Sequence, residues 1–272
     1  SYLMKCVIGI SYGHHESSAC LYFEDGRIVY LREEWLSRVK GDFRFPKFSL
    51  DYFCKLITIE NAQLISVCLF EKPLKTWLMS GLEKHLSSQN YLTKIRQFRQ
   101  GDIFFEREIK KIFPHKYEIV YCPHHLSHAL TTAAFAPFAN EKVLHVILDG
   151  YGDGSSGAIY TGFGINLDEV STFEKTSSLG LVYSALTEWA GFVPNEDEYK
   201  VMALAAFGKP EHEAFILNEV FGFNDDKLWV NEEYFNFIDL GLPAIKNKFC
   251  DKFGHLNDLM LKASSVKDNT DI

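Results

Sequence analysis

The sequence predicts an α/β protein in which a mixed sheet is flanked by helices. Two observations lead to this prediction. Short apolar runs of strand length alternate with stretches of helical periodicity along most of the chain. The first three runs follow one another closely, and Asp25-Gly26 stands between the second and the third as a tight hairpin turn. A chain of 272 residues can bury one large core or two smaller ones, so one large domain or two lobes is expected.

The first half of the chain has the element order of a known superfold. Strands are predicted at residues 6–10, 19–23, 27–31, 64–70 and 117–122, and helical patterns at residues 50–58 and 75–112. A further helix is expected directly after the last of these strands. Three strands followed by alternating helices and strands is the order of one lobe of the actin-like ATPase and sugar-kinase superfold, which is ribonuclease H-like. We therefore predict a first lobe over residues 4–140.

The second half is expected to begin a second lobe, over residues 141–272, with a helical insertion. Residues 143–148 are almost wholly apolar and predict a buried strand. Strands are predicted at 156–162 and 170–174, and helices at about 179–191, 197–207 and 256–264, the second of them with Val201, Leu204 and Ala205 as a buried stripe. We expect the chain to stop before its next element, so that the rest of this lobe lies beyond Ile272.

Composition argues against several classes of protein. A net charge of -8 does not favour broad binding to nucleic acid or to anionic membranes. No apolar stretch approaches the length of a membrane-spanning helix, and the N-terminus lacks a signal peptide, so a cytoplasmic protein is expected. A homodimer is considered, but the sequence does not decide the oligomeric state. Isolated cysteines predict buried free thiols rather than disulfides or a zinc site. They are Cys6, Cys20, Cys54, Cys68, Cys122 and Cys250.

The histidine pair His124 and His128 is the first candidate for chemistry. On a helix, residues four apart project from one face about 6 Å apart, so the two imidazoles could share one cation. Asp149 follows the apolar run 143–148 and is the natural third ligand, because ligands of α/β sheets gather where strands end. A pair at this spacing also occurs on helices that bind nothing. The spacing alone leaves both interpretations open.

Three further segments carry polar groups that could bind or react. His15 lies in the turn between the first two strands, where it could transfer a proton or simply be solvated. Arg38 and Lys40 could bind a phosphate or carbamoyl group, or belong to a solvated charged face. Glu198 and Lys200 begin a predicted helix and point either into a cleft or into water. Spacing does not choose between these alternatives.

Together these segments resemble the successive motifs of the O-carbamoyltransferases of the NodU/CmcH type, and specifically the N-terminal part of their actin-like domain. Seven motifs in the family's order cover residues 6–208, an arrangement far more specific than any single motif. The matching segments are His15-Glu16-Ser17-Ser18-Ala19, Glu33-Glu34 with Arg38-Val39-Lys40, Phe45-Pro46, His124-His125-Leu126-Ser127-His128-Ala129, Asp149-Gly150-Tyr151-Gly152-Asp153, Ser178-Leu179-Gly180-Leu181-Val182-Tyr183-Ser184 and Glu198-Tyr199-Lys200-Val201-Met202-Ala203-Leu204-Ala205.

The resemblance implies a transfer of a carbamoyl group from carbamoyl-adenylate to a hydroxyl of a small-molecule acceptor. It implies that His124, His128 and Asp149 bind a divalent metal, with Fe(II) the expected ion, and that His15 is the catalytic base. Carbamoyl phosphate and ATP would supply the adenylate in a separate YrdC-like domain. That domain, a further metal-binding aspartate and the adenine pocket are expected beyond Ile272, so residues 1–272 alone are expected to show little transfer.

The chain departs from the family pattern at a few positions. Gly41 follows Lys40 where many members have a histidine, and Glu16 replaces a usual aspartate. Ala203 and Ala206-Phe207 replace a usual glycine and a Pro-Tyr pair.

Three other functions are alternatives to carbamoyl transfer. An ATP-dependent kinase or ATPase of the same superfold would have a leading aspartate and a threonine in its first hairpin loop, and both are missing here. A zinc protease is disfavoured because His125 replaces the glutamate of His-Glu-x-x-His. A non-catalytic metal- or nucleotide-binding lobe stays open.

Overall fold

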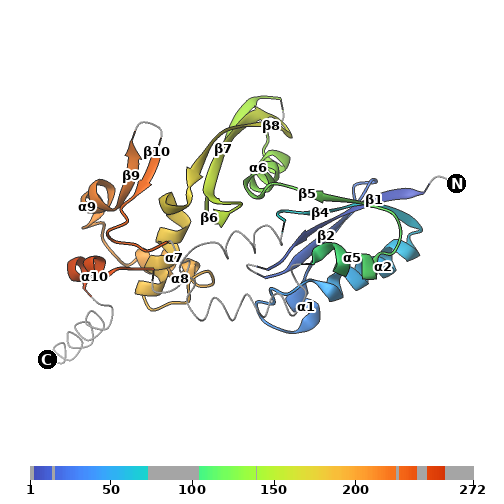
Figure 1. Ribbon diagram of the computed structural model, residues 1–272, viewed down its shortest axis with the longest axis horizontal. Helices are drawn as coiled ribbons and strands as arrows, with labels where there is room; N and C mark the ends of the chain where they lie inside the picture. The colour runs from blue at the N-terminus through green and yellow to red at the C-terminus, as the bar shows by residue number, and fades with distance from the viewer. Residues whose placement is uncertain are drawn as a thin grey trace. The chain divides into compact units, whose positions relative to one another are not determined.

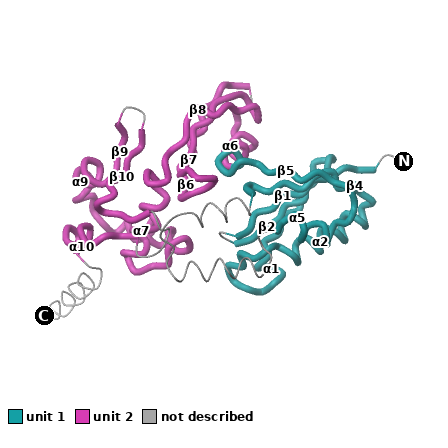
Figure 2. Tube along the Cα trace, in the orientation of Figure 1, with its two compact units in different colours: residues 1–127 teal, residues 128–272 magenta. Residues whose placement is uncertain are grey.

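The computed structural model describes residues 3–13, 16–72, 104–138, 140–224, 227–237 and 244–254. The chain forms two compact units, Ser1–Ser127 and His128–Ile272 (Figure 2). The boundary between them falls inside one helix, which begins at His124 and ends at Phe135. The assignment of residues 4–140 and 141–272 to two actin-like lobes stays a prediction.

The first unit is built on a five-stranded sheet in the order β3-β2-β1-β4-β5 (Figure 1). Strands β1, β2 and β3 pair antiparallel, whereas β4 runs parallel to β1 and β5 runs parallel to β4. This mixed sheet has the strand order and directions of a ribonuclease H-like sheet, so the predicted fold class is confirmed. Its strands are β1 (Met4–Ser11), β2 (Ser18–Phe23), β3 (Ile28–Arg32), β4 (Ala62–Leu69) and β5 (Glu118–Tyr121).

The predicted hairpin between β2 and β3 is present. Gly26 adopts a φ of 92°, a conformation that glycine reaches without a steric penalty. The backbone N–H of Phe23 donates to the carbonyl of Arg27 at 2.9 Å and closes the turn. The tight turn predicted at Asp25-Gly26 is therefore confirmed.

Helices of the first unit supply its core. The helices are α1 (Glu33–Ser37), α2 (Lys47–Ile59), α5 (Phe105–Ile112) and the start of α6 (His124–Phe135). Phe53 of α2 and Ile109 of α5 are fully buried in one cluster with Ile8, Leu21 and Val67 from the sheet. Apolar residues three or four apart on each helix face the sheet, as helical periodicity requires. Of the helical pattern predicted over residues 75–112, only the last part lies within the described residues.

The second unit contains a three-stranded antiparallel sheet in the order β6-β7-β8 and a separate hairpin of β9 and β10 (Figure 1). The predicted strands at 156–162 and 170–174 and helices at 179–191 and 197–207 are all present, with ends shifted by a few residues. The strands are β6 (Lys142–Gly152), β7 (Ser155–Phe163), β8 (Asn166–Glu174), β9 (Phe221–Asn224) and β10 (Lys227–Val230). The helices are α7 (Leu179–Trp189), α8 (Glu198–Ala205), α9 (Glu213–Phe215) and α10 (Asn247–Phe253), with short helical turns η1 (Lys175–Ser177) and η2 (Ile216–Val220). The helix predicted at 256–264 lies outside the described residues.

Two burial predictions in the second unit are wrong. Strand β6 was expected to be buried, but Leu144, Val146 and Leu148 on one of its faces are 60%, 51% and 48% exposed. The stripe predicted on α8 is not buried either, since Leu204 is 53% exposed and α8 has no buried residue. Periodicity reports which side chains share a face, whereas burial depends on whether another element packs on that face. Among the described elements, α8 packs mainly against α7.

All six cysteines are free thiols, as predicted, but only Cys6 is fully buried. Burial raises the pKa of the Cys6 thiol to about 11, so this group stays protonated at neutral pH. Among the helices of the described residues, none combines the length and the apolar character needed to cross a bilayer.

Candidate functional site

Helix α6 carries three histidines in its first five residues, at positions 124, 125 and 128. Pro123 immediately precedes the helix, where its fixed φ and missing N–H are well tolerated. The carbonyl of Pro123 accepts from the N–H of Ser127 at 2.9 Å, so the first turn is regular. His124 and His128 are therefore one helical turn apart, as their spacing predicted.

The His124 ring packs in an aromatic environment. Its centroid lies 5.2 Å from the ring of Phe70 and 5.1 Å from the ring of His125, both in edge-on geometry. His125 is buried, with 4% of its surface exposed. Packing of this kind limits the orientations open to both rings and therefore fixes where their nitrogens lie.

Asp149 lies within β6 and close to His128. The distance from Nε2 of His128 to Oδ2 of Asp149 is 3.6 Å, which is too long for a direct hydrogen bond. Two ligand atoms that each lie about 2.1 Å from one ion are about 3 to 4 Å apart, so the pair has the separation expected of ligands to one metal. The other carboxylate oxygen, Oδ1, accepts from the N–H of Gly150 at 2.7 Å.

A second contact in this unit joins α6 to β6. Oγ1 of Thr132 lies 2.7 Å from Nδ1 of the buried His145. Thr132 is one turn after His128 on α6, and His145 precedes Asp149 on β6. The helix and the strand are therefore fixed to each other near the His128–Asp149 pair.

The predicted metal ligands fall in both units, since His124 belongs to the first unit and His128 and Asp149 belong to the second. Within the second unit, the imidazole of His128 and the carboxylate of Asp149 are donors that suit zinc, iron and related divalent ions. His125, which the prediction did not include, is a further histidine of this helix and is buried. The role of His124, His128 and Asp149 as metal ligands stays a prediction.

The predicted base His15 lies outside the described residues, but the described residues on either side of it make contacts with the segment after α1. The N–H of Gly13 donates to the carbonyl of Phe43 at 2.8 Å, and the N–H of Ser17 donates to that of Asp42 at 2.6 Å. The Ser17 hydroxyl donates to the carbonyl of Arg44 at 2.5 Å. The segment after α1 therefore supports both ends of the turn.

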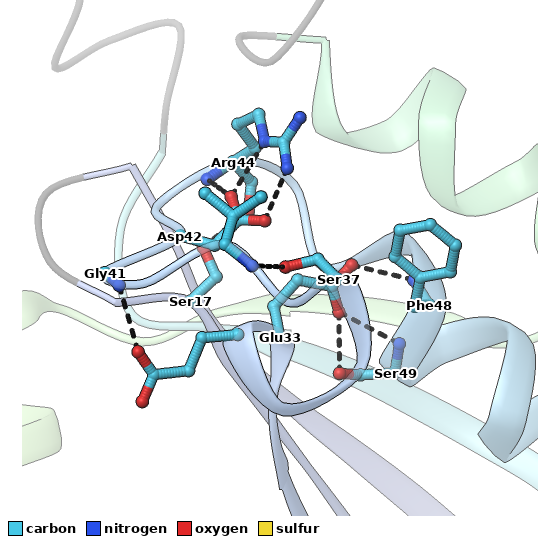
Figure 3. A network of polar contacts seen from close by, with 10 residues as sticks. Ser17, Glu33, Ser37, Gly41, Asp42, Arg44, Phe48 and Ser49 are labelled. Carbon is cyan, nitrogen blue, oxygen red and sulfur yellow. Dashed lines mark hydrogen bonds and ion pairs between the residues drawn. The ribbon is translucent and has the colours of Figure 1, made fainter.

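Two buried carboxylates hold that segment in place (Figure 3). Asp42 accepts two hydrogen bonds from the guanidinium of Arg44, at 2.8 and 2.6 Å, and this pairing lowers the pKa of Asp42 to about 2. Glu33 accepts from the N–H of Phe48, from the N–H of Ser49 and from the Ser49 hydroxyl, at 2.8, 3.0 and 2.7 Å. These bonds satisfy donors at the first turn of α2.

The predicted cationic residues of this segment are exposed. Arg38 ends α1 in the left-handed conformation, with a φ of 61°. The side chain of Lys40 is 89% exposed, and its Nζ lies 3.7 Å from Oε2 of Glu34. The N–H of Gly41 donates to the same oxygen at 2.9 Å. Arg38 and Lys40 are thus accessible to a ligand, and their phosphate-binding role stays a prediction.

Glu198 and Lys200 make local contacts at the start of α8. Oε1 of Glu198 accepts from the Ser184 hydroxyl at 2.8 Å and from the N–H of Asn195 at 2.6 Å. Nζ of Lys200 lies 2.7 Å from Oδ1 of Asp197, and this hydrogen bond raises the pKa of the lysine. Both residues therefore help to hold the segment between α7 and α8 in place. Their role in binding a substrate stays a prediction.

Comparison with solved structures gives only a distant likeness. A Ppx/GppA family member from Aquifex aeolicus superposes with a TM-score of 0.36 and 16% sequence identity, covering 76% of this chain and 64% of that one. A TM-score at this level establishes no common fold, and the fold class is taken from the sheet itself.

Curated relatives and a family model give a closer match. An uncharacterized protein of Synechocystis sp. is 29% identical over 265 residues, which are 92% of this chain and 42% of that protein. Nodulation protein NolNO of Sinorhizobium fredii is 28% identical over 199 residues, which are 72% of this chain and 28% of that protein. Nodulation protein NolO of Bradyrhizobium diazoefficiens is 38% identical over 88 residues, which are 32% of this chain and 16% of that protein. The chain thus spans less than half the length of these relatives. The family model described as carbamoyltransferase N-terminus matches residues 6–272, and the chain belongs to that family.

Proposed function

We propose that this chain is the N-terminal part of an O-carbamoyltransferase that moves a carbamoyl group from carbamoyl-adenylate to a hydroxyl of a small-molecule acceptor. The observation that carries the proposal is the family match over residues 6–272. The pair of His128 and Asp149, 3.6 Å apart, supports it with a metal-compatible geometry. Carbamoyl phosphate and ATP are proposed as the sources of the adenylate in the whole protein.

His124, His128 and Asp149 are proposed to hold a divalent metal, with Fe(II) as the first candidate. Two histidines and one carboxylate form a donor set that is common in non-haem iron proteins. A bound divalent ion would act as a Lewis acid on the carbamoyl carbonyl and would attract the phosphate of the adenylate.

In the proposed reaction His15 accepts the proton of the acceptor hydroxyl as that oxygen attacks the carbamoyl carbon. A new carbon–oxygen bond forms to the acceptor, and the bond between the carbamoyl carbon and the phosphate oxygen breaks. Adenylate leaves with the electron pair of that bond. Arg38 and Lys40, both on the segment that supports the turn of His15, are proposed to bind the phosphate.

The proposal is tested with synthetic carbamoyl-adenylate, a panel of hydroxyl compounds and the gene product that contains residues 1–272. We expect release of adenylate together with an O-carbamoylated product detected by mass spectrometry. His15→Ala should abolish transfer and leave metal content unchanged, whereas Asp149→Ala should lower both. Lys142→Ala, a change of an exposed residue on the same strand as Asp149, is the control. Product formation that survives His15→Ala and Asp149→Ala would rule the mechanism out.

Metal content and product formation in the same samples also distinguish a carbamoyltransferase from a metal-binding lobe without transferase activity. Metal that depends on His128 and Asp149, with no product from any acceptor of the panel, would favour that alternative. If His124→Ala, His128→Ala and Asp149→Ala all leave the metal content unchanged, these residues do not bind the metal and the proposed metal site is wrong.

A further inference from the structure

The segment Ser178-Leu179-Gly180 lies directly against the backbone of Asp149. Ser178 is the N-cap of the eleven-residue helix α7, and its Oγ accepts from the N–H of Leu181 at 2.9 Å. The same oxygen lies 2.9 Å from the carbonyl oxygen of Asp149 and 2.7 Å from that of Gly150. Ser178 is completely buried. Its single hydroxyl hydrogen is therefore shared between two consecutive carbonyls of β6.

These two carbonyls lie where the β6–β7 ladder is interrupted. The pairing runs from Lys142 opposite Phe163 to Leu148 opposite Gly157, and it resumes at Gly152 opposite Ser155. The residues in between form a bulge, which removes them from the regular ladder. Buried carbonyl groups need a donor, and Ser178 supplies one to both Asp149 and Gly150.

Gly180 permits this close approach of α7 to β6. A Cβ atom at position 180 would lie 2.5 Å from the nitrogen of Gly150 and 2.7 and 2.8 Å from the carbonyl carbon and oxygen of Asp149. All three atoms belong to one peptide group of the backbone, which cannot turn aside as a flexible side chain could. Any larger residue at position 180 would therefore push α7 away from the Asp149–Gly150 peptide.

The same peptide group sets the direction of the Asp149 carboxylate. Its N–H, from Gly150, donates to Oδ1 of Asp149 at 2.7 Å, which leaves Oδ2 on the side of His128. If the peptide rotated, Oδ1 would follow its donor and the position of Oδ2 relative to Nε2 of His128 would change. Contacts from α7 to the backbone thus determine the geometry of a candidate metal ligand on β6.

We propose that Ser178 and Gly180 are positioning residues for Asp149, and that they hold its carboxylate in the orientation that binds a divalent metal. The inference rests on the proposed metal site of His124, His128 and Asp149. Neither residue contacts the metal in this proposal. Residues that orient metal ligands typically affect metal affinity by about 10- to 100-fold when they are replaced.

The test uses Co(II) as the probe, because its visible absorption reports both binding and ligand geometry. Ser178→Ala and Gly180→Ala should each raise the Kd for Co(II) by about 10-fold or more and alter the spectrum of the bound ion. Ser178→Thr retains the hydroxyl and should restore binding close to that of the unchanged protein.

Two matched variants separate positioning from a general loss of stability. Thr187 of α7 is also buried and donates its hydroxyl to a backbone carbonyl, that of Tyr183 at 2.9 Å. At Gly162 an added Cβ would collide with backbone atoms of Asn166. Thr187→Ala and Gly162→Ala should lower the Tm, yet change the Kd for Co(II) by no more than about twofold, because independent sites rarely couple more strongly.

The outcomes distinguish this inference from the proposed function. If the unchanged protein binds Co(II) and Asp149→Ala does not, the metal site stands. The positioning role is then overturned if Ser178→Ala binds Co(II) as tightly as Ser178→Thr, or if all four variants lose affinity in proportion to their loss of Tm. If the unchanged protein and Asp149→Ala bind Co(II) equally, both the metal site and the positioning role are wrong. If Gly180→Ala does not fold, the comparison of the Kd for Co(II) between Ser178→Ala and Ser178→Thr tests the positioning role.

Discussion

The sheets of the two units contain similar apolar strands in different surroundings. In the first unit, Ile8 of β1 and Leu21 of β2 are completely buried beneath α2 and α5. In the second, Leu144 and Val146 of β6 are more than half exposed, although β6 is at least as apolar over residues 143–148. An apolar run therefore identifies a strand, whereas the elements that pack on the strand determine whether its side chains stabilise the unit.

The charged side chains of the two units also differ in how deeply they are buried. Glu33 and Asp42 of the first unit are almost completely buried and fully engaged in hydrogen bonds. The ion pair of Asp197 and Lys200 in the second unit lies at the surface, where solvent screens it. If burial accounts for this contrast, substitutions at buried positions of the first unit should lower the free energy of unfolding more than comparable substitutions at exposed positions of the second unit.

Leu21→Ala should cause the largest loss of stability. The side chain is 0% exposed in the core of the first unit, and replacement of such a leucine typically costs about 2 to 5 kcal/mol. Urea unfolding followed by circular dichroism measures the change. Tyr22→Ala, at an exposed position of the same strand, is the control and should cost less. A loss below about 1 kcal/mol for Leu21→Ala would contradict the assigned core.

Glu33→Gln should cost about 2 kcal/mol, because an amide can accept from fewer of the three donors around it and places its own N–H groups among them. The matched variant is Glu198→Gln in the second unit. Glu198 also accepts from a serine hydroxyl and a backbone N–H, but it is only partly buried. We expect a clearly smaller change in the unfolding free energy there. Equal effects would show that burial does not separate the two carboxylates.

Asp42 should contribute a pH-dependent part of the stability of the first unit. Its pKa in the folded protein is about 2, below the value of an unfolded aspartate, so folding favours the charged form. The stabilisation is therefore complete above about pH 5 and is lost as the pH falls toward 2. A difference of this size corresponds to roughly 2 kcal/mol.

Unfolding in urea between pH 2 and pH 6 measures this effect. Asp42→Asn should be less stable at pH 6 and should show a flatter pH dependence than the unchanged protein. Asp25→Asn removes a surface pair with Arg27 and should alter the pH dependence less, since that pair is exposed. An unchanged slope in Asp42→Asn would exclude the proposed contribution.

Leu144→Ala should have the smallest effect, below about 1 kcal/mol, because the side chain is 60% exposed and little apolar surface returns to water. The same urea experiment applies, with Leu21→Ala as the reference. A loss as large as that of Leu21→Ala would mean that this face of β6 is covered in solution.

The sequence by itself predicted what depends on local geometry. The succession of strands and helices in the first unit, the turn at Gly26 and the one-turn separation of His124 and His128 all follow from short-range periodicity and backbone preference. The ordered motifs also predicted the family that the model over residues 6–272 identifies. Each single element and each single motif is encoded within a short stretch of chain, and the order of the motifs along the chain identified the family.

Contacts between residues far apart in the chain were not predictable from sequence patterns and are seen only in the folded structure. The fold brought Ser178 and Gly180 of α7 against the peptide of Asp149, placed Oδ2 of that residue 3.6 Å from His128, and left one face of β6 exposed. No local pattern could give these results, because burial and side-chain contacts depend on which elements pack together. The physical reason is that a side chain's environment is set by its neighbours in space, whereas periodicity records only its neighbours in sequence.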